Sequence, residues 1–143
     1  MTDFTTVQLE KDPRGFATLW LSRPEKNNAF NAEMIRELIL ALDAVGEDKS
    51  LRFLLLRGRG KHFSAGADLA WMQHAATLDY NANLSDAREL AELMYNLNGL
   101  KIRTPDAPLY LTTLDIMGAT ATPMALSEVY LGLQQNTIDA QEN

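Results

Sequence analysis

The sequence of 143 residues contains no cysteine, which excludes disulfide bridges and thiolate metal sites. No stretch approaches the ~18 apolar residues of a membrane-spanning helix, and the first residues lack the basic and apolar segments of a secretory signal. The only histidines, His62 and His74, are far apart in the sequence and have no clustered carboxylates around them. We therefore expect both to be surface residues, and we expect no metal site.

Basic residues are also in the minority, with 13 Lys and Arg against 19 Asp and Glu and a formal net charge of −6. This balance argues against a broad nucleic-acid-binding face. Arg57, Arg59 and Lys61 are spaced along one glycine-rich loop, which leaves room for a small basic site for one phosphorylated ligand. With 46% hydrophobic and 22% charged residues, the composition is that of a globular protein. The sequence predicts a cytoplasmic location and no membrane partner.

The order of the predicted elements indicates an α/β fold. Alternating residues predict strands over 4–10 and 15–22 joined by a hairpin turn, and four apolar residues predict a buried parallel strand over 52–56. Apolar residues at helical spacing predict the helices. The first runs from the cap Asn31 to Val45, with Gly46 as the stop, and the second begins at about Asp68. The third runs from Ser85 to Leu97, and the fourth covers 109–117. The last runs from the cap Ser127 to about Gln135, with Asn136 as the stop, and residues 120–124 are compatible with a strand.

The segment Phe63-Ser64-Ala65-Gly66-Ala67-Asp68-Leu69 follows the buried strand and opens a helix. Its small residues let a ligand approach the backbone, and free N–H groups at such a turn can bind an oxyanion or a phosphate. Taken alone, the segment is better explained as a turn that is rich in glycine and alanine for packing.

A second segment, Leu21-Ser22-Arg23-Pro24-Glu25-Lys26-Asn27-Asn28-Ala29-Phe30-Asn31, joins an earlier strand to a helix. The two segments together, in this order and at this separation, resemble the crotonase (enoyl-CoA hydratase/isomerase) superfamily over residues 1–97. Residues 68–72 and the helix over 85–97 are most similar to hydratases of branched acyl-CoAs, such as 3-methylglutaconyl-CoA hydratase.

The resemblance implies a coenzyme A thioester as substrate, no further cofactor, and specific roles for the two segments. The backbone N–H of Ala67, in the turn with Gly66, would form half of an oxyanion hole, and the backbone of Ala65 would meet the adenine. The loop of Lys26, Asn28 and Ala29 would hold coenzyme A, with Lys26 near its phosphates, although a solvated lysine is the simpler interpretation. Asp68 belongs to the same turn, where a carboxylate also favours the first turn of a helix.

The crotonase pattern ends near Leu97. The family's second oxyanion glycine turn and its catalytic glutamates are not found after this point, and neither Glu128 nor Glu142 has the expected context. Residues 98–143 instead resemble a central segment of TRAP-transporter solute-binding proteins, through Gly99-Leu100-Lys101-Ile102-Arg103-Thr104-Pro105, then 118–124, 127–135 and 139–143. The junction falls between Leu97 and Pro105.

This second resemblance implies that Arg103 forms a salt bridge to a ligand carboxylate and that Asn143 also contacts the ligand; the alternative for Arg103 is an exposed arginine at the end of a strand. We expect the segments 1–97 and 98–143 to pack as one domain, a crotonase-like half-sheet extended by further strand–helix units. Open sheet edges would favour a homo-oligomer. Three functions remain: a weak or inactive acyl-CoA hydratase, a binder of small carboxylates, and a structural chimera without a native ligand.

Overall fold

The structure, a computed structural model, describes residues 3–98, 101–104, 119–135, 137–138 and 140–142. Its centre is a six-stranded sheet with the order β1-β2-β3-β6-β4-β5. Only β1 runs antiparallel to its neighbour, and the other strands of this described sheet are parallel. The strands are β1 (Val7–Asp12), β2 (Phe16–Leu21), β3 (Phe53–Gly58), β4 (Lys101–Thr104), β5 (Thr120–Pro123) and β6 (Ala140–Glu142).

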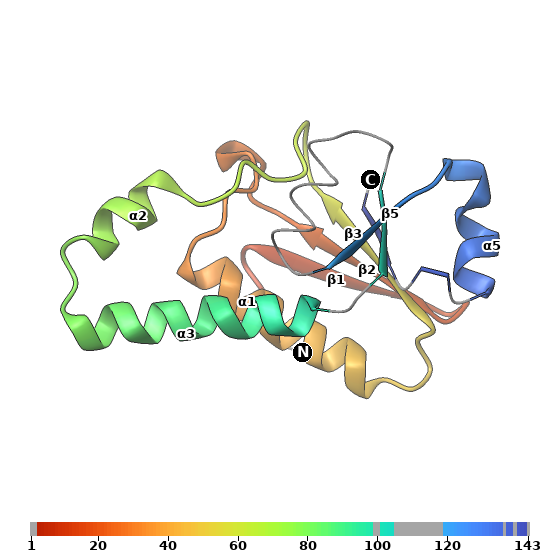
Figure 1. The fold of residues 1–143 in the computed structure, drawn as a ribbon, viewed down its shortest axis with the longest axis horizontal. Coiled ribbons are helices and arrows are strands. Elements are labelled where there is room, and N and C mark those ends of the chain that lie inside the picture. Colours follow the sequence, from red (N-terminus) through yellow and green to blue (C-terminus); the bar gives the residue numbers. More distant parts are fainter. Residues whose placement is uncertain (1–2, 99–100, 105–118, 136, 139, 143) are drawn as a thin grey trace.

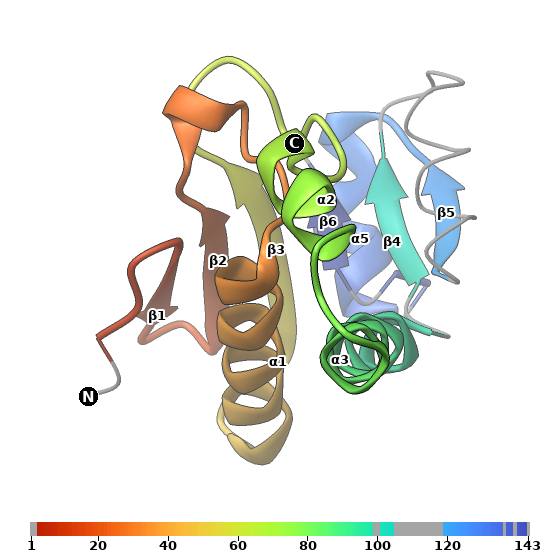
Figure 2. The same ribbon diagram turned by 90° about the vertical axis from the view of Figure 1, so that its left-hand side faces the viewer.

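Helices lie on both faces of the sheet. Helices α1 and α3 lie on one face and α5 lies on the other, behind β6 in Figure 2. Helix α2 and the beginning of α3 extend away from the sheet (Figure 1). The helices are η1 (Pro24–Lys26), α1 (Ala32–Glu47), α2 (Leu69–Ala75), α3 (Tyr80–Leu97), η2 (Leu126–Glu128) and α5 (Val129–Gln134). The predicted α/β fold is therefore confirmed, with a crotonase-like half-sheet formed by β1, β2 and β3.

The main core lies between this half-sheet and helices α1 and α3. Alternate residues of β2 and β3 point to the same side of the sheet, as strand geometry requires, and meet the apolar stripe of α1. The buried members are Val7, Ala17, Leu19, Leu21, Met34, Ile35, Leu38, Ile39, Ala41, Leu54, Leu56, Leu93 and Leu97. Burial of these side chains fixes the positions of the loops that follow β2 and β3.

The half-sheet is extended in an order that the sequence did not indicate. Strand β6, the last along the chain, lies between β3 and β4, with Leu55 paired to Gln141 and Gln141 paired to Arg103. Strand β5 lies at the far edge and ends at Pro123, a residue that edge strands tolerate. Residues from after the predicted junction therefore pair directly with the crotonase-like strands.

Several predicted boundaries are wrong. The first strand begins at Val7 because the Glu37 carboxylate accepts hydrogen bonds from the amides of Thr5 and Thr6, at 2.8 and 2.7 Å. Helix α1 continues through Gly46 to Glu47, since one glycine costs only about 1 kcal/mol in a helix.

The later helices also differ from prediction. Helix α3 begins at Tyr80 rather than Ser85, because Asp79 caps it by accepting from the Ala82 amide at 2.9 Å. Ser127 lies inside the 3-10 turn η2 instead of capping the last helix. The predicted caps Asn31 and Asp68 are confirmed. The helix predicted over 109–117 and its stop at Gly118, like the stop at Asn136, fall outside the described residues.

Candidate acyl thioester site

The two segments singled out in the sequence meet at the carboxyl ends of β2 and β3. The Phe30 amide donates to the Gly66 carbonyl at 2.7 Å, and the Asp68 amide donates to the Phe30 carbonyl at 2.8 Å, so that Phe30 and Ala67 form a parallel β-bridge. The Ala65 amide adds a third bond, to the Asn27 carbonyl at 2.9 Å. These backbone hydrogen bonds bring together loops that are almost 40 residues apart in sequence.

The bridge leaves the Ala67 amide free. In a parallel bridge of this register, Gly66 O and Asp68 N face Phe30, and the N–H of Ala67 therefore points away from it. Ala67 is exposed, and its amide donates to no other group among the described residues. A fixed, solvent-facing N–H immediately before a helix is a suitable donor for an oxyanion.

Gly66 permits the turn through its backbone conformation. Its φ is +86°, and a Cβ added there would meet nothing within 4 Å. Its amide donates to Ser64 Oγ at 3.1 Å, and that hydroxyl donates to the Asn28 carbonyl at 2.9 Å. The requirement for glycine at this position is thus conformational and not steric.

Gly66→Ala should lower the free energy of unfolding by about 1 kcal/mol, because an L-residue is strained at positive φ. Gly46→Ala is the matched control, since a Cβ there also meets nothing within 4 Å, but the site lies in α1. That change should raise the free energy of unfolding by about 0.5–1 kcal/mol. Urea denaturation of both variants tests this, and equal effects of the same sign would contradict the conformational explanation.

Asn28 organises the loop from within. It is fully buried, with a φ of +53°. Its Nδ2 donates to the carbonyls of Arg59 and His62, at 2.9 and 2.7 Å, and its Oδ1 accepts from the Arg23 amide at 2.9 Å. All of these partners belong to the protein backbone, so the side chain of Asn28 orders the loop rather than reaching a ligand.

Arg23 and Asp68 form the electrostatic centre of the site. Arg23 Nη2 donates to Asp68 Oδ2 at 2.9 Å, and Nη1 donates to the Ala29 carbonyl at 2.6 Å. Asp68 Oδ1 accepts from the amides of Ala70 and Trp71 at the start of α2. The hydrogen bond from Arg23 lowers the pKa of Asp68, burial opposes this, and the two amides lower it further. The carboxylate is therefore held charged by the protein itself.

The other predicted site residues are only partly brought near this centre. Lys26 is exposed in η1, Ala65 is exposed beside Gly66, and Ala29 is buried. Arg103 lies in β4 in register with Gln141, while Asn143 lies outside the described residues. The sequence analysis missed the roles of Arg23 and Ser64. Arg23 stands in the quoted motif, but only the fold shows that it reaches Asp68.

Both histidines are exposed, as predicted. Within the described parts of the chain, no group of three potential metal ligands occurs, and no helix is long and apolar enough to cross a membrane.

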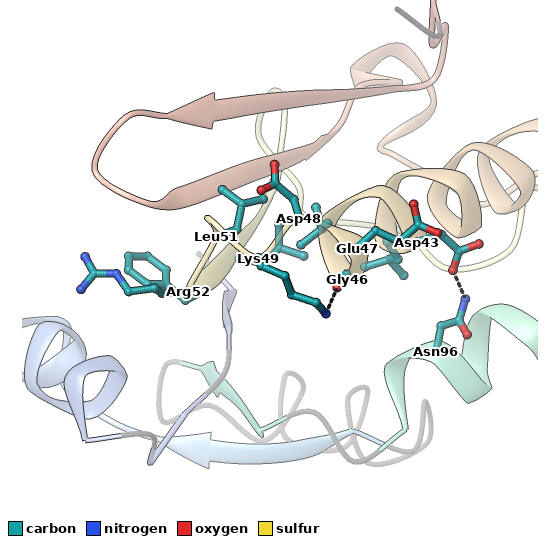
Figure 3. A pocket seen from close by; sticks show the side chains of 12 residues that line it. Asp43, Gly46, Glu47, Asp48, Lys49, Leu51, Arg52 and Asn96 are labelled. Atoms are coloured by element: carbon teal, nitrogen blue, oxygen red, sulfur yellow. Dashed lines mark hydrogen bonds between the residues drawn. The ribbon is translucent and has the colours of Figure 1, made fainter.

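A separate hollow lies elsewhere in the described part of the chain (Figure 3). It measures about 650 Å³ and lies between the end of α1 and the start of β3, lined by Leu42, Lys49 and Phe53 among others. Lys49 Nζ donates to the Gly46 carbonyl there, at 3.1 Å. Because this hollow lies at the amino end of β3 and the Gly66 turn follows its carboxyl end, the two are separate features.

Comparison with known proteins separates the chain into two overlapping parts. The family model described as enoyl-CoA hydratase/isomerase matches residues 11–102, and that of the bacterial extracellular solute-binding proteins, family 7, matches residues 80–143. A trans-2-decenoyl-[acyl-carrier-protein] isomerase of Streptococcus mutans is 34% identical over 119 residues, which are 83% of this chain and 44% of that protein.

Two further relatives represent the two parts. The crystal structure of an enoyl-CoA hydratase from Shewanella pealeana superimposes with a TM-score of 0.62 at 41% identity, covering 66% of this chain and 35% of the other. The sialic acid-binding periplasmic protein of Vibrio cholerae is 50% identical over 48 residues, 34% of this chain and 15% of that protein. The chain spans less than half the length of these relatives. It belongs to the enoyl-CoA hydratase/isomerase family through residues 11–102, and its residues 80–143 are similar to a segment of the bacterial extracellular solute-binding proteins, family 7.

Proposed function

We propose that the chain binds acyl-CoA thioesters at the turn of Ala65, Gly66 and Ala67, with little or no hydratase turnover. The observation that supports this most is the free, exposed amide of Ala67, fixed by the bridge to Phe30. Such a donor can polarise a thioester carbonyl, and one oxyanion donor contributes about 3 kcal/mol in a transition state. Lys26, exposed on the neighbouring loop, would attract the phosphates of coenzyme A.

Low turnover is expected because the described carboxylate beside the turn, that of Asp68, is not free to act as an acid or base. Hydration needs a group that can move protons to and from water and the α-carbon. Asp68 is next to Ala67, but its two oxygens are occupied by Arg23 and by the amides of α2. The family match also ends at residue 102, before the segment expected to supply a second donor and the catalytic glutamates.

The acyl group, assembly and location belong to the proposal as well. Residues 68–72 favour a branched acyl group of the 3-methylglutaconyl type, and the open edges β1 and β5 favour a homo-oligomer. The proposal also holds that segments 1–97 and 98–143 pack as a single domain and that the protein is cytoplasmic. Small-carboxylate binding through Arg103 and Asn143 is a second candidate, favoured by the 50% identity to a sialic acid-binding protein over 48 residues.

Calorimetric titration with crotonyl-CoA, coenzyme A and crotonate tests the proposal. We expect crotonyl-CoA to bind, and Lys26→Met to weaken that binding severalfold through the lost phosphate contact. Arg88→Met removes an exposed positive charge from another element, α3, and should have no effect.

Three other results would contradict the proposal. Binding of crotonate alone, lost in Arg103→Met, would favour the second candidate. Cooperative unfolding that no ligand shifts would favour a chimera without a ligand. Rapid hydration of crotonyl-CoA that Gly66→Ala abolishes would show that the turnover statement is wrong.

A further inference from the structure

The face of the half-sheet that points away from α1 and α3 carries aromatic side chains and an arginine. We call this face the outer face, and its side chains alternate with the core residues of the same strands. They are Phe16 and Trp20 of β2 and Phe53, Leu55 and Arg57 of β3. Phe16 and Phe53 stack with ring centroids 5.1 Å apart, and Trp20 is paired in register with Arg57. The Arg14 guanidinium carbon lies 5.0 Å from the Phe16 ring centroid, but Arg14 is paired with Asp12, so the unpaired cation of the outer face is at the Trp20 end.

Two guanidinium groups lie on the Trp20 ring. The carbon of the Arg57 guanidinium is 4.5 Å from the ring centroid, and that of Arg59 is 3.7 Å away. Arg59 is neutralised, because its Nη2 donates to Glu10 Oε1 at 2.9 Å and to Gln8 Oε1 at 2.8 Å. Stacking on an indole restricts both side chains, and Arg57 is the guanidinium left without a counter-ion.

Arg57 forms none of the ion pairs found among the described residues. Its Nε is buried without a hydrogen-bond partner, and so is Nε1 of the adjacent Trp20. Both atoms are donors, and a guanidinium stays charged at every physiological pH. A partly desolvated cation without a counter-ion is unfavourable, so binding of an anionic acceptor beside Arg57 would be favourable.

We propose that the outer face binds a monocarboxylate with an apolar body, its carboxylate on Arg57 and its body along Leu55 toward the Phe16–Phe53 stack. A planar carboxylate fits the guanidinium in a two-pronged geometry. The nearby Glu10 disfavours a dianion. Leu55 and Phe53 precede Arg57 by two and four residues on the same face, which provides an apolar track of about 13 Å. This site is independent of the acyl thioester turn.

Amide NMR of the full chain, titrated with sodium acetate and sodium hexanoate, tests this site through the indole N–H of Trp20. The second tryptophan is an internal control, because Trp71 Nε1 donates to Asp86 Oδ2 at 3.3 Å. We expect saturable shifts at Trp20 and none at Trp71. Hexanoate should bind roughly tenfold more tightly than acetate, since its added methylene groups are partly buried on the outer face.

Arg57→Met should abolish the response while the dispersion of the other amide signals shows that the fold persists. Arg88→Met removes the same positive charge from an exposed residue of α3 and should leave the Trp20 response intact. The proposal is wrong if Trp20 does not shift at millimolar hexanoate, if both indoles shift together, or if the response survives in Arg57→Met. Tighter binding of inorganic phosphate than of acetate would also overturn it, because it would identify a different class of anion.

Discussion

Asn28→Asp should lower the free energy of unfolding by roughly 3 kcal/mol or more at pH 7, because it places an unpaired charge in a buried site. The new carboxylate keeps the acceptor for the Arg23 amide but loses the Nδ2 donor that now binds the carbonyls of Arg59 and His62. Three oxygens would then face one another in a fully buried position. Since native domains are stable by only about 5–15 kcal/mol, urea denaturation should show a large shift of the midpoint.

Asn27→Asp is the matched control. Asn27 precedes Asn28, has the same left-handed backbone with a φ of +50°, and is exposed. The same change there should alter stability by less than about 0.5 kcal/mol. Equal effects at the two positions would show that the Asn28 side chain does not hold the loop.

The pH dependence of Asn28→Asp provides a second test. Burial beside two carbonyl oxygens should raise the pKa of the new carboxyl group above its unfolded value of about 3.9. The folded state then binds more protons than the unfolded state, and the deficit against the natural sequence should shrink as the pH falls from 7 toward 4. A deficit that does not change with pH would indicate a purely steric effect.

Local patterns predicted the elements that bury one regular face. Met34, Ile35, Leu38 and Ile39 recur at helical spacing and are all buried in α1. The predicted glycine turn and the cap Asp68 were also placed correctly, because both depend on nearby residues. The fold class and the position of the Gly66 turn could therefore be predicted from the sequence, while the binding of a thioester at this turn remains a prediction.

Long-range pairing could not be predicted in the same way. Strand β6 lies between β3 and β4, where Gln141 pairs with both Leu55 and Arg103. No local sequence pattern encodes such a choice of partner strand. Asn28 stands in a polar stretch that indicates an exposed loop, yet it is fully buried. Polar residues that tie loops together from inside are visible only when their partners are brought close by the fold.

Asp68→Asn should lower the free energy of unfolding by about 3 kcal/mol, because it leaves the mostly buried Arg23 guanidinium, 14% exposed, without a counter-ion. The asparagine oxygen can still accept from the Ala70 amide, now at 2.8 Å, so the cap of α2 persists. Circular dichroism should show an unchanged helix content, and chemical denaturation should show the loss. A variant that is as stable as the natural sequence would contradict a role for the ion pair.

The double variant Arg23→Met/Asp68→Asn separates the ion pair from its surroundings. With both charges removed, no charge remains uncompensated, and the loss should be smaller than the sum of the two single losses by about 1–3 kcal/mol.

The pH profile of stability adds an independent measure of the ion pair. Because Arg23 holds the pKa of Asp68 below its ordinary value, the stabilisation is present above pH 3.9, the unfolded value, and is lost as the pH falls through the lower folded value. Acid titration of stability should therefore be steeper for the natural sequence than for Asp68→Asn below about pH 4, and parallel profiles would show that Asp68 carries no such linkage.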